Sequence, residues 1–179
     1  NYPLMESIAM QIQQCGTTAQ GLLDAGIANK QTLLAAMADE ILGEEEQLTP
    51  TDDGGELARE LLGWAHALRS KLLAHRDGAE LVSSAMSVGL VTTDPSVQLA
   101  SFLQDCGGCD SQTARAASQA LTHLVVGHVM DEQARRQLFE LNVIDTFDGE
   151  AQEIEFDVGV RLLVTGIRGA SCVMKTHDA

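Results

Sequence analysis

The chain has 179 residues, of which 45% are hydrophobic and 3% aromatic, and its formal net charge is −15 at pH 7. The hydrophobic content suffices for a substantial core and excludes a disordered chain, and the few aromatic residues favour helices over a β-sandwich. The negative charge excludes a general attraction to nucleic acid or to anionic membranes.

The first 46 residues are expected to form three helices. Apolar side chains recur at helical spacing over residues 4–14, 19–25 and 30–46, and Asn29 is a suitable N-cap for the third segment. Residues 48–55 then combine threonine, proline, aspartate and glycine without an apolar run, which is typical of a loop between elements. We therefore divide the chain into residues 1–46 and 47–179.

The second part is expected to contain five helices, over residues 56–75, 79–86, 96–105, 112–130 and 150–167. Gly78 separates the first two helices, and Asp94 caps the third, with Pro95 in its first turn. Asp110 or Ser111 caps the fourth. Residues 133–149 are polar and mixed, which predicts a mobile connection, and the helical pattern fades after Gly169. The fold class predicted from these patterns is all-α.

Membrane and disulfide signals are weak throughout the sequence. No stretch approaches about 18 consecutive apolar residues, and nothing at the start resembles a signal peptide. Four cysteines are too few and too scattered for a disulfide scaffold. We therefore expect a cytoplasmic protein without membrane contact. Cys106 and Cys109 have the spacing of a redox or zinc half-site, but no second pair accompanies them, and the glycines between them suit a turn.

Four segments resemble the tetracycline-repressor (TetR) family. Residues 29–42 (NKQTLLAAMADEIL) are similar to the helix that joins the family's DNA-reading head to its core. Residues 72–79 (LLAHRDGA) and 123–133 (HLVVGHVMDEQ) are similar to two stretches beside the family's ligand pocket. Residues 156–159 (FDVG), followed by Leu162, Leu163 and Gly166, fit the family's final helix. Together the resemblance covers roughly residues 29–168.

This resemblance implies an Ω-shaped helical homodimer, in which the helices over 112–130 and 150–167 of two copies pair as a four-helix bundle. It further implies a helix-turn-helix-like head and connecting helix in residues 1–46, and a ligand-binding and dimerisation domain in residues 47–179. The implied function is a transcriptional regulator that responds to a small molecule. Ligand binding would swing the two heads apart, as a shift between two dimer geometries.

The head departs from the family pattern in its charge. Helix-turn-helix heads hold phosphates with lysine, arginine and backbone amides, but residues 1–46 contain one basic residue, Lys30, and seven acidic ones. DNA would repel a head of this charge, and Gly21 and Gly26 weaken the helix expected to contact bases. The alternative is a repressor-like protein without DNA binding. Its pocket would serve sequestration of a polycyclic or polyketide-like molecule, or cofactor-free acid–base catalysis on it.

The ligand site also departs from the family pattern. Tetracycline-type repressors surround a magnesium-bound drug with a histidine, an Arg-Pro pair and an acid, whereas the matching positions here hold Val82, Met86 and Ser87. The resemblance leaves Asp131 as the acid and Gln98 as a polar contact, so we expect an apolar or polycyclic ligand without metal or cofactor. Trp64 is either a core residue or a stacking surface for a planar ligand. The predicted ligand-binding residues are Trp64, His66, Leu68, Leu72, His75, Val82, Met86, Gln98, Phe102, His123, Met130 and Asp131.

The densest group of titratable residues lies in the segment 123–132. His128 and Asp131 are three residues apart and can meet on one face of a helix. A histidine held by a carboxylate can act as a general acid or base near neutral pH, so in an enzyme His128, Asp131 and His75 would be catalytic. The simpler interpretation is a hydrogen-bonded pair at a helix end or a dimer seam.

Overall fold

The computed structural model describes residues 30–44, 48–50, 54–106 and 108–175. Within these ranges all regular secondary structure is helical, which confirms the all-α prediction. The helices expected over 4–14 and 19–25, and the cap at Asn29, lie outside the described residues. The described helices are α3 (Lys30–Leu42), α4 (Gly54–Leu73), α5 (Gly78–Ser87), α6 (Pro95–Asp105), α7 (Ser111–Glu140) and α8 (Gly149–Lys175).

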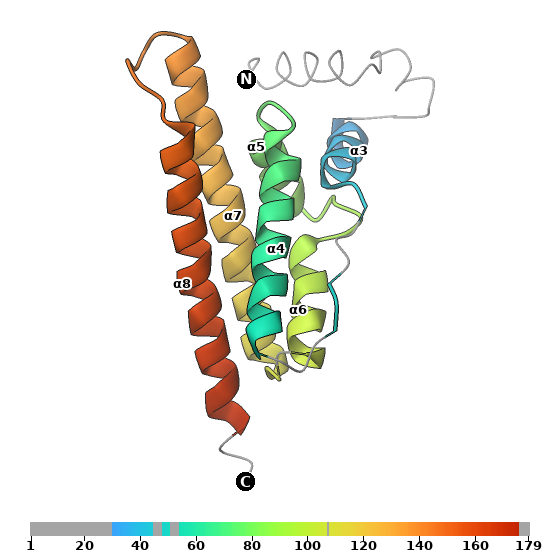
Figure 1. Cartoon of the computed structure of the whole chain (residues 1–179). Coiled ribbons are helices and arrows are strands. Elements are labelled where there is room, and N and C mark those ends of the chain that lie inside the picture. Colours follow the sequence, from blue (N-terminus) through green and yellow to red (C-terminus); the bar gives the residue numbers. More distant parts are fainter. Residues whose placement is uncertain (1–29, 45–47, 51–53, 107, 176–179) are drawn as a thin grey trace.

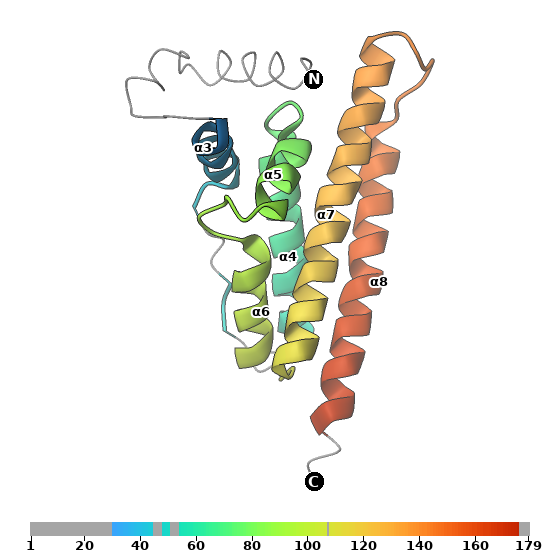
Figure 2. The same ribbon diagram turned by 180° about the vertical axis from the view of Figure 1, so that it is seen from behind.

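The two longest helices, α7 and α8, run side by side along one edge of the molecule (Figures 1 and 2). α4 packs against both of them and also against α3 and α5, so it is the central helix of the core. α6 packs on α7, and α3 lies against α5. Fully buried side chains such as Leu61, Leu99, Leu121 and Phe156 fill the space between the helices, and each contributes about 1.5–3 kcal/mol by its burial.

Local capping signals fix several helix ends as predicted. Asp94 accepts a hydrogen bond from the Ser96 amide at 2.8 Å, with Pro95 at the first position of α6. Asp110 accepts two backbone hydrogen bonds at the start of α7, at 2.8 and 3.0 Å. Both carboxylates satisfy amides that have no partner within their own helix.

The break between α4 and α5 covers residues 74–77 and ends at Gly78, the residue that was predicted to interrupt the helix. Asp77 has a φ of 56°, and a Cβ on Gly78 would lie 2.6 Å from the Leu72 carbonyl oxygen, so only glycine fits. Gln133 of α7 holds both sides of this corner. Its Nε2 donates to the carbonyl oxygens of Leu72 and His75 at 3.0 and 2.8 Å, and its Oε1 accepts from the Ala79 amide at 3.3 Å.

Three predicted boundaries were wrong by more than two residues. α3 ends at Leu42 instead of residue 46, because Gly43 takes a φ of 60° and its amide bonds to the Asp39 carbonyl at 2.8 Å. α7 continues ten residues beyond Met130, to Glu140, so residues 133–140 are helical and not a connection. Ion pairs four residues apart, Arg135–Asp131 and Arg136–Glu132, stabilise this polar stretch, which lacks a clear apolar period. α8 likewise passes Gly169 and ends at Lys175.

Candidate functional site

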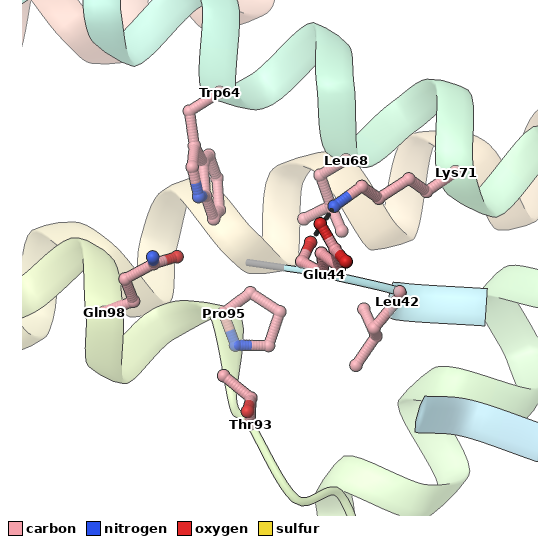
Figure 3. Close-up of a pocket in the computed structure, with 9 residues that line it drawn as sticks. Leu42, Glu44, Trp64, Leu68, Lys71, Thr93, Pro95 and Gln98 are labelled. Atoms are coloured by element: carbon pink, nitrogen blue, oxygen red, sulfur yellow. Dashed lines mark hydrogen bonds between the residues drawn. The ribbon is translucent and has the colours of Figure 1, made fainter. Parts of the chain in front are cut away.

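A small cavity lies where the end of α3 meets α4 and the start of α6 (Figure 3). We call it the α3–α4–α6 cavity. Its volume is about 30 Å³, which holds one or two water molecules and is far below the roughly 300–1,000 Å³ of pockets for drug-sized ligands. It is lined by Leu42, Gly43, Glu44, Trp64, Leu68, Lys71, Thr93, Pro95 and Gln98.

The cavity has apolar walls and polar ends. Trp64, Leu68 and Leu42 are 3%, 5% and 7% exposed, so their side chains belong to the core as well as to the cavity wall. At one end, the Lys71 Nζ donates to the Glu44 carbonyl oxygen at 2.7 Å, and the Gln98 amide lies near Trp64 at the other (Figure 3). Apolar walls with a few polar groups are typical of small-molecule sites.

The structure brings three of the predicted ligand residues together in this cavity, namely Trp64, Leu68 and Gln98. Their role in binding stays a prediction. Four others are apolar and lie away from the cavity: Leu72, Val82 and Phe102 are buried in the core, and Met86 packs against it half-buried.

The α3 helix is tied to the cavity wall by a second contact that the sequence did not indicate. Asp39 of α3 accepts a hydrogen bond from the Thr92 amide at 2.8 Å and another from the Thr92 hydroxyl at 2.5 Å. Thr92 directly precedes Thr93, which lines the cavity. The segment between α5 and α6 is therefore fastened to α3 beside the cavity.

The predicted pair of His128 and Asp131 does not form, because each residue has another partner. The His128 Nε2 bonds to the Gln152 carbonyl oxygen at 2.9 Å, whereas Asp131 is exposed and pairs with Arg135 at 2.8 Å. His75 is half-buried at the corner between α4 and α5. The three residues proposed for catalysis are thus not assembled into one site.

His123 and Met130, also predicted for the ligand site, are exposed on α7. His66 lies on the side of α4 that faces α8, where its Nε2 is 3.3 Å from the Asp157 carboxylate. Hydrogen bonds from Arg161 first, at 2.6 Å, and then from His66 hold the pKa of Asp157 below its ordinary value.

A buried ion pair joins α4 to α7 beside these histidines. Glu132 is 2% exposed and accepts from the Arg69 Nη2 at 2.8 Å and from the Arg136 Nη2 at 3.4 Å. The Arg69 guanidinium also lies 5.2 Å from the centre of the Phe156 ring, within the range of a cation–π contact. Sequence reasoning missed this group, since Arg69 and Glu132 are 63 residues apart.

Metal binding has little support among the residues that the structure describes. No three histidine, cysteine, aspartate or glutamate side chains there are grouped to hold an ion. Cys106 is half-buried and Cys109 buried, and both are free thiols. None of the described helices is long and apolar enough to cross a membrane.

Comparisons with known proteins agree with one another. Residues 49–142 match the family described as "Tetracyclin repressor-like, C-terminal domain". The class E tetracycline repressor protein of Escherichia coli is 29% identical over 157 residues, covering 78% of this chain and 71% of the relative. Among solved structures, BioQ of Mycobacterium smegmatis is 31% identical, with a TM-score of 0.66 over 89% of this chain and 84% of that chain. BioQ with its natural double-stranded DNA operator is also similar, at 31% identity, with a TM-score of 0.62 over 90% and 85%.

Proposed function

The chain belongs to the tetracycline-repressor family, and we propose that it is a transcriptional regulator controlled by a small molecule bound in the α3–α4–α6 cavity. One observation carries this proposal: the end of α3 and the two residues after it, Leu42, Gly43 and Glu44, form part of the cavity wall. α3 is also the helix that follows residues 1–29, the greater part of the proposed head and connecting helix over 1–46. A ligand that widens the cavity would press on this helix.

Two relatives with known partners support the proposal. The Escherichia coli relative is a tetracycline repressor, and BioQ was solved with its natural DNA operator. Tetracycline response and operator binding are properties of those two relatives. For this chain we propose the same two kinds of partner, a small molecule bound in the α3–α4–α6 cavity, mostly by residues of the part 47–179, and DNA bound through residues 1–46.

Two contacts would couple the cavity to α3. The hydrogen bond from Lys71 to the Glu44 carbonyl fixes the segment just after α3 to α4. The two hydrogen bonds that Asp39 accepts from Thr92 fix the last turn of α3 to the loop before α6. Because both contacts bridge walls that a ligand must separate, an occupied cavity would favour a second position of α3. The ligand shifts this equilibrium only by its difference in affinity for the two positions.

We propose further that the functional unit is a homodimer formed by the outer face of α7 and α8. Ile154, Val158 and Leu162 follow one another at four-residue spacing on α8 and are 58%, 52% and 71% exposed, so they share one face. In Figures 1 and 2, α8 lies at the edge of the molecule with α4 and α7 on its inner side. An exposed apolar face of this kind marks an interaction surface, and two copies of α7 and α8 would make a four-helix bundle.

The acidic charge of residues 1–46 favours a second candidate function, a protein that sequesters or transforms its ligand without binding DNA. One basic residue against seven acidic ones opposes phosphate binding. The catalytic form of this alternative lacks geometric support, since His128, Asp131 and His75 are held by separate contacts or at separate places.

Fluorescence anisotropy with DNA from the region flanking the protein's own gene separates the two functions. Low salt maximises the electrostatic part of binding, so the regulator is expected to bind this DNA there and to prefer it to a scrambled duplex of the same length. Absence of binding at low salt would contradict the regulator and leave the sequestering protein. Turnover that is lost in Asp131→Asn, with ligand binding retained, would instead establish catalysis.

A further inference from the structure

The α3–α4–α6 cavity is bounded along α4 by two large side chains. Trp64, Leu68 and Lys71 line it from α4, and spacings of four and three residues place them on one face of the helix. Because Trp64 and Lys71 are seven residues apart, their backbones are separated by roughly 10 Å along the helix axis. Their side chains therefore mark two ends of the cavity about two helical turns apart.

The shape of this space suits a flat molecule. The Trp64 indole stands at one end, and the Pro95 ring faces the cavity from α6 (Figure 3). Leu42 and Leu68 supply aliphatic sides. An indole offers a planar surface on which another ring can stack. Once the cavity widens, two fused rings fit within the roughly 10 Å between the Trp64 and Lys71 backbones, whereas a linear array of four is longer than this separation.

The walls differ in how readily they can move. At about 30 Å³ the cavity must widen even for a single ring, since an engineered cavity that binds benzene has a volume of about 150 Å³. Trp64 and Leu68 are 3% and 5% exposed and packed in the core, so displacing them would expose apolar surface. Gly43 and Glu44 are exposed. Widening is therefore easiest on the α3 side, and Trp64 stays as the fixed end.

We infer that Trp64 sets the upper size limit of the ligand, so that the cavity takes a flat, mainly apolar molecule of one or two fused rings. This inference rests on the proposed function, because it concerns the ligand of the same cavity. It distinguishes this chain from a tetracycline-binding relative, since tetracycline has four fused rings. Replacing Trp64 by a smaller side chain lengthens the space toward Gln98.

The test compares 1-naphthol, which has two fused rings, with tetracycline, by isothermal titration calorimetry on the full chain. Wild type is expected to bind 1-naphthol at least tenfold more tightly than tetracycline. Binding should also quench the fluorescence of Trp64, the sole tryptophan of the sequence. Trp64→Leu is expected to shift the affinity ratio at least tenfold toward tetracycline. Leu121→Val, a buried change on α7 away from the cavity, serves as the matched control and should leave the ratio unchanged.

Three results would overturn the inference: equal affinities in wild type, no binding of 1-naphthol by wild type, or an unchanged ratio in a folded Trp64→Leu variant. Circular dichroism checks the fold, and Trp64→Phe replaces Trp64→Leu if the latter does not fold, with the same direction expected. The expected ratios, combined with DNA binding that 1-naphthol does not alter, would support the size limit while contradicting ligand control of DNA binding by such molecules.

Discussion

Removing Arg69 tests whether the buried ion pair between α4 and α7 is as important as its geometry indicates. In Arg69→Met, Glu132 would remain 2% exposed and keep only the 3.4 Å contact with Arg136, a half-exposed side chain. Breaking one partner of a buried pair typically costs about 3–5 kcal/mol, because a charge is left without compensation. With Arg136 still near, we expect a loss of about 3 kcal/mol, or roughly 6–12 °C in melting temperature for a chain of this size.

Urea unfolding followed by circular dichroism, at one protein concentration, measures this loss. Arg135→Met, on α7 beside Glu132, is the matched control, because its pair with Asp131 is exposed and surface pairs contribute about 0–1 kcal/mol. Arg69→Met combined with Glu132→Leu is expected to recover most of the stability, since no charge is then buried alone. A loss below about 1 kcal/mol in the single variant, or no recovery in the double variant, would refute the reasoning.

Three further predictions address the corner, the titration of α8 and the proposed dimer. Gly78→Ala should destabilise the fold by about 1–3 kcal/mol in urea unfolding, since the added Cβ meets a carbonyl oxygen at 2.6 Å; unchanged stability would contradict the steric argument. Because the Arg161 hydrogen bond lowers the pKa of Asp157, its stabilising effect is complete above the unfolded value, near 3.8, and disappears as pH falls through the lower folded value. Asp157→Asn should therefore flatten the dependence of the unfolding free energy on pH at acidic pH, below about 5. An unchanged pH profile would argue against this effect. Leu162→Glu should convert the dimer to a monomer in sedimentation velocity. Val97→Glu is the control and should not, because Val97 is similarly exposed (64% against 71% for Leu162) but lies on α6, outside the proposed interface. A monomeric wild type would contradict the dimer proposal.

The parts of the fold that were predictable from sequence depend on short-range signals. Asp94 and Asp110 precede helical segments and cap them in the structure, and Gly78 interrupts a helical pattern where a Cβ cannot fit. The extension of α7 beyond Met130 was missed because ion pairs four residues apart hold a stretch with no apolar period. Hydrophobic periodicity reports the buried face of a helix and not every helical residue.

The candidate site was only partly predictable for a similar reason. Trp64 and Leu68 belong to one face of α4, but Leu72 continues the same apolar pattern and lies in the core away from the cavity. Residue type alone therefore does not separate a cavity wall from a core position. The Asp39–Thr92 contact joins residues 53 positions apart, so it depends on the packing of α3 beside the loop before α6 and leaves no local pattern.

Hydrogen–deuterium exchange of the α3 amides, with and without saturating 1-naphthol, tests the central claim that occupancy of the cavity is relayed to α3. Binding of the probe is expected to change amide exchange in residues 30–44 and in residues 92–94, because a widened cavity disturbs the contacts of Asp39 and Lys71. Thr92→Val, which removes the hydroxyl bond to Asp39, should reduce the change in α3 without abolishing binding. Saturation of the cavity, shown by quenching of Trp64, with exchange in α3 unaltered would contradict the account.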